Sequence, residues 1–393
     1  MKRHHKPERP YDVVLYGATG FVGTLTAAYL AAHAPDGLRW ALAGRSREKL
    51  ERLRAGLAVK GPEPGLLVAD ADEPTALREL ALSARVVATT VGPFLRYGNA
   101  LVAACARAGT DYLDLTGEAE FIDRTWLEHD GTARETGARL VHACGFDSVP
   151  HDLGAYFTVR QLPEGVPLTV DAFVRAHAVF SGGTFASAVN AMGRGPQMLA
   201  AARERREREP RLTGRRVRTP LGAPHFSGET GTWALPLPTV DPQIVGRSAR
   251  ALERYGPDFR YRHFASVKHL PVALGGTAGV ISLVAAAQLP FVRVWMTDRY
   301  QSGDGPDEER RSRSRFTVRF VGEGGGRQVF TEVSGGDPGY DETARMLGEA
   351  ALCLALDDLP EASGQVTTAV AMGDALLERL RASGLGFRVA ARR

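Results

Sequence analysis

This chain of 393 residues contains few cysteines and few lysines. Cys105, Cys144 and Cys353 are scattered, which excludes a small disulfide-stabilised fold and indicates a reducing, cytoplasmic setting. Lysine occurs five times, so the net charge of +4 comes mainly from arginine. Zinc-finger spacing and interleaved basic and aromatic residues are also missing, and the sequence therefore predicts no nucleic-acid partner.

Two further absences narrow the class of protein. No tyrosine is followed by lysine four residues later. Short-chain alcohol dehydrogenases need that pair for proton transfer, so their standard mechanism is excluded. The polar, basic N-terminus has no apolar stretch, so we expect no signal peptide and a disordered tail over residues 1–10.

Long uncharged runs are rare, and the exception covers residues 270–292. That length could span a bilayer. The run is rich in alanine, however, and it is interrupted by Pro271, Gly275, Gly276, Gly279 and Pro290. We expect buried core or the wall of an apolar pocket, and membrane association through this run remains the less favoured alternative.

The most informative motif present is a glycine turn between an apolar run at 13–16 and an expected helix at 24–32. Strand, glycine turn and helix begin a dinucleotide-binding unit. Glycines permit the tight turn, the approach of a pyrophosphate and close packing of helix on strand, while the helix N-terminus attracts phosphate. The predicted cofactor contacts here are Gly17, Thr19, Gly20, Phe21, Val22 and Gly23.

The end of the second expected strand favours NADPH over NADH. An NAD site would place Asp or Glu there to bind the ribose 2′-hydroxyl. This chain has Arg45 and Ser46 instead, a permanently charged donor fork and a hydroxyl that suit a 2′-phosphate. At the end of the third strand, Asp70 is a candidate for the adenine amine, with capping of the next helix as the structural alternative.

Further strands alternate with helices up to residue 150, which predicts a Rossmann-type doubly wound parallel sheet. Because ligands lie beyond the carboxyl ends of such strands, the residues after the fourth and sixth strands should border the cofactor. These predicted contacts are Val91, Gly92, Pro93, Cys144 and Gly145.

After residue 150 the spacing of hydrophobic residues along the sequence changes. Residues 168–178 alternate like a half-buried strand, and 315–320 pairs with 327–333 as a hairpin. We therefore expect an NADP-binding domain over 11–150 and a second α+β domain, with a mainly antiparallel sheet, over 151–335. The second domain would bind substrate and form a homodimer. Helices over 336–393 would return to the first domain.

Several motifs together resemble the saccharopine dehydrogenase-like oxidoreductases. They are GATGFVG at 17–23, AGRS at 43–46, TVGPF at 90–94, DYLDLTGE at 111–118 and CGFDSVP at 144–150. The C-terminal stretches GYDETA at 339–344 and MGDALLERL at 372–380 resemble the actinobacterial branch called trans-acting enoyl reductases. This resemblance implies an NADPH-dependent reductase that acts on an α,β-unsaturated thioester of a lipid or polyketide intermediate carried by a synthase.

Conjugate reduction needs a proton source and donors near the thioester oxygen. Tyr97, Asp147 and Ser148 are the catalytic candidates, with packing as the alternative for Tyr97 and helix capping for the other two. His142, Cys144, Asp147 and His151 fit no standard zinc spacing, so no metal is predicted. The arginine-dense stretch 203–218 could dock an acidic acyl carrier protein, although a solvated helix face is the simpler interpretation.

The residues alone leave two other functions open. One is reduction of a C=N bond in an amino-acid or specialised-metabolite intermediate, as in saccharopine-type enzymes. The other is a nucleotide-binding, membrane-associated protein without catalysis, for which the uncharged run at 270–292 is the cue.

Overall fold

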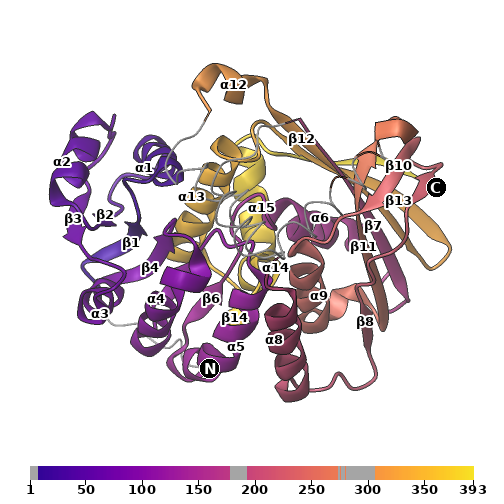
Figure 1. Cartoon of the computed structure of the whole chain (residues 1–393), viewed down its shortest axis with the longest axis horizontal. Coiled ribbons are helices and arrows are strands. Elements are labelled where there is room, and N and C mark those ends of the chain that lie inside the picture. The colour runs from indigo at the N-terminus through magenta and orange to yellow at the C-terminus, as the bar shows by residue number, and fades with distance from the viewer. Residues whose placement is uncertain (1–7, 178–192, 273–274, 276–278, 280–305) are drawn as a thin grey trace. The chain divides into compact units, whose positions relative to one another are not determined.

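The computed structural model describes residues 8–177, 193–272, 275, 279 and 306–393. The chain forms two compact units (Figure 1). Met1–Phe146 and Tyr340–Leu380 make the first, and Asp147–Gly339 and Arg381–Arg393 make the second. Among the described residues, no helix has the length and apolar character needed to cross a membrane.

The first unit contains a seven-stranded sheet in the order β14-β6-β5-β4-β1-β2-β3. All its pairings are parallel. The order reverses beside β1, and open parallel sheets bind ligands beyond the strand ends at such a point. The strands are β1 (Tyr11–Tyr16), β2 (Trp40–Gly44), β3 (Gly65–Val68), β4 (Ala84–Thr89), β5 (Asp111–Leu113), β6 (Arg139–Val141) and β14 (Gly364–Val366).

Helices cover this sheet and bury its apolar residues. Val14, Tyr16 and Val87 of the strands share a core with Leu101 and Phe121 of the helices. Helices α3, α4 and α5 pack in series, while α1 packs on α13, which contacts β1, β4 and β5. The helices are α1 (Phe21–His33), α2 (Arg47–Gly56), α3 (Pro74–Ser83), α4 (Phe94–Ala108), α5 (Ala119–Thr136), α13 (Asp341–Leu356), α14 (Thr368–Ala371) and α15 (Gly373–Ala382).

The second unit is built on a mixed eight-stranded sheet. Its order is β15-β13-β12-β7-β11-β10-β9, with β8 paired to β11. The pairings of β11 with β7 and with β8 are parallel, and the others are antiparallel. The strands are β7 (Leu168–His177), β8 (Arg216–Arg218), β9 (His225–Ser227), β10 (Thr232–Pro236), β11 (Asp258–Val267), β12 (Arg315–Gly324), β13 (Arg327–Gly335) and β15 (Gly386–Arg392).

Helices α6 and α9 pack on each other and on this sheet. Gly154 makes the approach of α6 possible, because a Cβ there would lie 2.4 Å from the ring of Phe320. The helices of this unit are α6 (Val149–Val159), α8 (Gly195–Arg208), α9 (Asp241–Ala251) and α12 (Glu308–Arg313), with a 3₁₀ turn at Glu253–Tyr255.

The parallel sheet, the strand near 168–178 and the hairpin across 324–327 agree with the sequence prediction. The structure differs at the C-terminus, because β15 pairs with β13 and so Arg381–Arg393 belongs to the second unit. The first segment of the NADP-binding unit also ends at Phe146 and not at residue 150. Most of the uncharged run at 270–292 lies outside the described residues.

Candidate functional site

The glycine turn after β1 is held in the shape that a pyrophosphate site needs. Gly17 adopts φ +84°, where an L side chain is strained, and a Cβ there would lie 2.7 Å from Val91 Cγ2. A Cβ on Gly23 would lie 2.1 Å from the carbonyl oxygen of Gly17. The hydroxyl of Thr90 donates to that same oxygen at 3.0 Å. Glycine is therefore required at both positions, and α1 begins directly against the turn.

The N-terminus of α1 is built to receive an anion. The helix begins at Phe21 with Gly20 as its N-cap, and no side chain caps it. Uncapped N–H groups and the helix dipole favour a phosphate at this position. The predicted contacts Gly17, Gly20 and Gly23 thus lie together at the carboxyl end of β1, as the sequence indicated.

Arg45 follows β2 and presents an exposed guanidinium. Within the described chain no hydrogen bond or ion pair of this side chain is found, so its donors are available to a ligand. Its charge and that of Asp70 both act on the pKa of Tyr16, the last residue of β1. Burial raises the pKa of Tyr16 to about 12, Asp70 adds to the rise and Arg45 opposes it. Arg45 and Asp70 therefore both lie near the carboxyl end of β1, on the side of β2 and β3, where the nucleotide should lie.

Ser46 and Asp70 also have structural roles. The hydroxyl of Ser46 accepts from the backbone N–H of Lys49 at 3.3 Å and caps α2. One carboxylate oxygen of Asp70 accepts from the N–H of Asp72 at 3.1 Å and closes the turn before α3. Asp70 thus stabilises the turn but does not cap α3, whose N-cap is Glu73. Nucleotide contacts by Ser46 and Asp70 stay predictions.

The segment after β4 is held by the carboxylate of Glu118, for whose role the sequence alone gives no signal. Val91, Gly92 and Pro93 lead into α4 through a cis Gly92–Pro93 peptide bond. Glu118 then accepts from the N–H of Phe94 at 3.0 Å and from that of Leu95 at 2.9 Å. Burial raises the pKa of Glu118, although these two N–H groups oppose the shift. Glu118 thus fixes the start of α4 beside a predicted cofactor loop.

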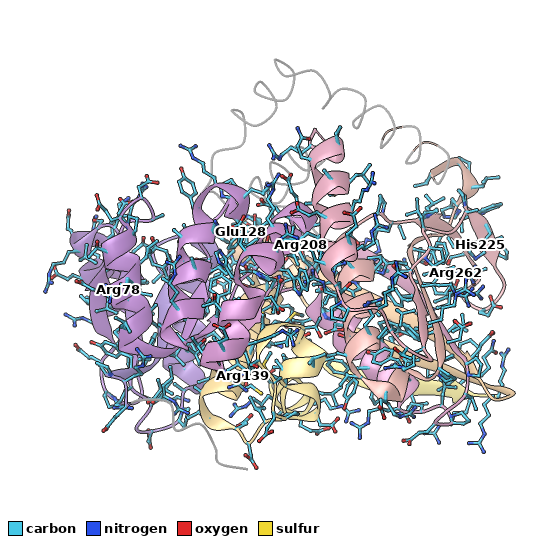
Figure 2. All side chains as sticks on the ribbon, turned by 90° about the horizontal axis from the view of Figure 1, so that it is seen from below. Arg78, Glu128, Arg139, Arg208, His225 and Arg262 are labelled. Atoms are coloured by element: carbon cyan, nitrogen blue, oxygen red, sulfur yellow. The ribbon has the colours of Figure 1, made fainter. Side chains whose placement is uncertain are left out.

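We expect Glu118→Gln to lower the free energy of unfolding by about 1–3 kcal/mol, the cost of leaving a buried N–H without its charged acceptor. Chemical denaturation followed by circular dichroism measures this loss. Glu128→Gln on α5 (Figure 2) is the matched control, because Glu128 is exposed and accepts from Asn99 Nδ2 at 3.0 Å. Equal losses in the two variants would show that Glu118 does not organise α4.

The segment after β6 is organised by Asp114. Its carboxylate accepts from the backbone N–H groups of Thr116 and Ala143, both at 3.0 Å, and its Oδ2 lies 2.6 Å from Nδ1 of His142. Ala143 adopts φ +59°, a strained value for a residue with a Cβ. The backbone N–H of Cys144 donates to the carbonyl of Asp114 at 2.7 Å. Asp114 therefore holds the predicted cofactor loop in a conformation it would not otherwise favour.

Gly145 completes this loop against α13. A Cβ at Gly145 would lie 2.9 Å from both Leu115 Cδ2 and Thr343 Cγ2. The N–H of Phe146 donates to the hydroxyl of Thr343 at 3.1 Å. The C-terminal segment of the chain thus supports the loop after β6.

The three catalytic candidates fall in different units. Tyr97 lies in the first turn of α4 in the first unit, half-buried, with the guanidinium of Arg96 4.8 Å from its ring centre. Asp147 and Ser148 begin the second unit. Burial raises the pKa of Asp147 to about 7, and the charge of Asp241 adds to the rise. Ser148 is the N-cap of α6, yet its side chain makes no capping hydrogen bond.

His142, Cys144, Asp147 and His151, which fit no standard zinc spacing in the sequence, are divided between the two units. His142 lies beside Asp114 in the first unit, and its Nε2 is 3.2 Å from the hydroxyl of Thr125. Its two ring nitrogens are therefore both engaged by protein groups. Cys144 belongs to the first unit as well, whereas Asp147 and His151 belong to the second.

Three arginines of the arginine-dense stretch pair with its own glutamates. On α8, Arg203 pairs with Glu207 at 3.0 Å, and Arg208 (Figure 2) pairs with Glu204 at 2.7 Å. Such exposed pairs at a spacing of four residues are typical of a solvated helix. The geometry therefore gives no particular support to a docking role for this helix.

Comparison with known proteins identifies the nucleotide unit and then the whole chain. Residues 13–141 match the family model of the saccharopine dehydrogenase NADP binding domain. A Mycobacterium tuberculosis protein assigned to the trans-acting enoyl reductases is 39% identical over 96% of this chain and 97% of its own length. The trans-acting enoyl reductase of Mycobacterium leprae is 38% identical with the same coverage. The chain belongs to the trans-acting enoyl reductase family.

The fold of this trans-acting enoyl reductase family member agrees with that of a solved structure. Apo saccharopine dehydrogenase (L-Glu forming) from Saccharomyces cerevisiae aligns with a TM-score of 0.56 over 97% of this chain and 100% of that chain, at 12% identity. This likeness confirms the predicted architecture of a Rossmann-type sheet with a second α+β domain. The chain is thus an NADP-binding oxidoreductase of the saccharopine dehydrogenase type.

Proposed function

We propose that this protein uses NADPH to reduce the C=C bond of an α,β-unsaturated thioester in a lipid or polyketide intermediate. One observation supports this most strongly. A glycine cradle, followed by Arg45 with no ion pair among the described residues, lies in a chain 37–39% identical, over nearly its full length, to trans-acting enoyl reductases. The reduction of a C=C bond is taken from the names of those relatives, and the lipid or polyketide thioester from what the sequence resemblance implies.

The reaction requires the protein to bind a dinucleotide and to deliver one proton. When bound, NADPH supplies a hydride to the β-carbon of the enoyl thioester, and a proton added at the α-carbon gives the saturated thioester and NADP⁺. The glycine turn and the start of α1 would hold the pyrophosphate, and Arg45 the 2′-phosphate. Tyr97, Asp147 and Ser148 stay the candidates for proton delivery and for hydrogen bonds to the enolate oxygen.

The proposal also covers the protein's binding partners and its location in the cell. A thioester substrate carried by a synthase implies contact with an acyl carrier protein, and the second unit is the candidate for substrate binding and homodimer formation. The three scattered cysteines are buried and form no disulfide within the described residues, which fits a cytoplasmic reductase.

Titration with NADPH and NADH, followed by turnover assays with enoyl-thioester and imine panels, tests the function. We expect tighter binding of NADPH and loss of nicotinamide absorbance with enoyl thioesters. Turnover confined to imines would assign the protein to C=N reduction. Absence of nucleotide binding would contradict the proposal altogether.

Proton delivery is tested residue by residue with Tyr97→Phe, Asp147→Asn and Ser148→Ala. Removing the group that donates the proton should lower kcat by roughly 10²–10⁴-fold, while the Kd for NADPH stays unchanged. Single-turnover kinetics, with NADPH binding measured separately, distinguish these effects. A candidate whose variant keeps kcat within a few-fold of the wild type is not the proton donor.

A further inference from the structure

Three side chains distant in sequence converge inside the second unit. His151 comes from α6, Asp241 is the first residue of α9 and His263 lies in β11. All three are 2–3% exposed. Nδ1 of His151 lies 2.8 Å from Oδ1 of Asp241, and Nε2 of His263 lies 3.5 Å from Oδ2 of Asp241. One potential ligand atom from each residue falls within 4.8 Å of the others.

Neighbouring polar groups orient two of these side chains. The hydroxyl of Tyr261 lies 2.9 Å from Nδ1 of His263, which leaves Nε2 facing Asp241. The hydroxyl of Thr239 donates to Oδ2 of Asp241. Metal-binding imidazoles and carboxylates are characteristically held by such hydrogen bonds through their second nitrogen or oxygen. The cluster therefore has oriented ligands and the groups that orient them.

The facing atoms of the cluster contact one another, but not in good hydrogen-bond geometry. In the described part of the chain, no hydrogen bond of acceptable geometry is made by Oδ1 of Asp241 or by Nε2 of His263, and both atoms are buried. Buried polar atoms normally have a partner, so each such atom calls for an explanation. Two of them in one cluster, beside a further imidazole, point to an ion between them.

We infer that His151, Asp241 and His263 form a binding site for one divalent transition-metal ion, for which zinc is the best match. Two imidazoles and a carboxylate, with a fourth position for water, are a common zinc ligand set. Zinc–ligand bonds of about 2.0–2.1 Å place tetrahedral ligand atoms roughly 3.3 Å apart. Here one ligand atom from each residue lies within 4.8 Å of the others, so small side-chain movements would bring the three atoms to zinc-binding distance. This site does not depend on the proposed reduction, although Asp147, a candidate for proton delivery, interacts electrostatically with His151 and Asp241.

Charge and position support an ion that stabilises the second unit. A divalent ion with one carboxylate ligand leaves a single positive charge, and the carboxyl group of Asp147 interacts electrostatically with both His151 and Asp241. The ion would join the first turns of α6 and α9 to β11. Binding to the folded state alone would therefore raise the melting temperature.

The test uses the full chain without a histidine tag, in a His4→Gln/His5→Gln background that removes the adjacent N-terminal histidines. Elemental analysis after purification should find about one zinc per chain. After chelation, titration with Co²⁺ should produce the visible absorption of a tetrahedral site. Added Zn²⁺ should raise the melting temperature of the chelated protein.

Variants assign the ligands. Asp241→Asn and His263→Gln should lose the bound metal, and Tyr261→Phe, which removes an orienting group, should weaken binding by about 10–100-fold. His263→Cys should add a cobalt–thiolate charge-transfer band, which identifies the ligand even if the other variants fail to fold. His225→Gln is the control, because this imidazole lies on β9 of the same unit (Figure 2) and contacts the carbonyl of Ala223.

Each result of these experiments either supports the metal site or overturns it. Stoichiometric metal that is retained in His225→Gln and lost in Asp241→Asn would support the site. Absence of bound zinc, with no cobalt spectrum, would overturn it and leave the cluster as a buried charge network. Metal retained by Asp241→Asn and His263→Gln together would overturn it as well, because the ion would then bind elsewhere.

Discussion

Gly23→Ala is expected to abolish binding of both NADPH and NADH. The added Cβ would lie 2.1 Å from the carbonyl oxygen of Gly17 and 2.9 Å from the carbonyl carbon of Ala18. Both are backbone atoms, so no side-chain rotation relieves the clash and α1 must move away from the turn. The N-terminal N–H groups would then no longer face the pyrophosphate. Overpacking of this kind typically costs about 1–3 kcal/mol of stability.

Fluorescence titration with both nucleotides measures this loss, and circular dichroism reports whether the variant remains folded. Gly131→Ala on α5 is the control, because a Cβ there would meet no atom within 4 Å. We expect it to keep nucleotide binding and to gain up to about 1 kcal/mol of stability from helix propensity. Wild-type affinity in Gly23→Ala would show that the nucleotide does not bind at the glycine turn.

Arg45→Ala should weaken NADPH binding by roughly 10–100-fold while NADH binding changes by less than about 3-fold. A charged hydrogen-bonding pair contributes about 1.5–3 kcal/mol, and only NADPH carries the 2′-phosphate that would form it. The exposed guanidinium makes no ion pair within the described residues, so its removal has little structural cost. The ratio of the Kd for NADPH to the Kd for NADH, measured in wild type and variant, tests whether Arg45 binds the 2′-phosphate.

Arg47→Ala provides the matched control for Arg45. Arg47 is also exposed, but it pairs with Glu51 on α2 at 3.0 Å. Its loss should leave the preference for NADPH intact. If Arg45→Ala weakens both nucleotides alike, or if Arg47→Ala has the same effect, the assignment of the 2′-phosphate to Arg45 is wrong.

Local patterns predicted the nucleotide unit well because the signals lie within short segments. The glycine turn and the strands before and after it define a parallel sheet without knowledge of the rest of the chain. β14 was missed because it is three residues long and pairs with β6, which lies more than two hundred residues earlier. β15 alternates buried and exposed residues around Phe387, but its partner β13 could not be read from the sequence.

The supporting residues of the site were harder to predict. The motif DYLDLTGE was recognised, yet nothing in it revealed that Glu118 binds N–H groups 23 and 24 residues earlier in the chain. That contact arises only when β4 and β5 pair. The cluster of His151, Asp241 and His263 shows the same limit, since three separate elements must pack before its members meet.

The most direct test of the proposed reduction follows the hydride itself. NADPH deuterated at the reactive position of its nicotinamide would be incubated with the protein and an enoyl thioester in ordinary water, and the product analysed by mass spectrometry and NMR. We predict one deuterium at the β-carbon and a solvent-derived proton at the α-carbon. An unreduced thioester, with deuterium transferred only to the carbon of an added imine, would contradict the proposal.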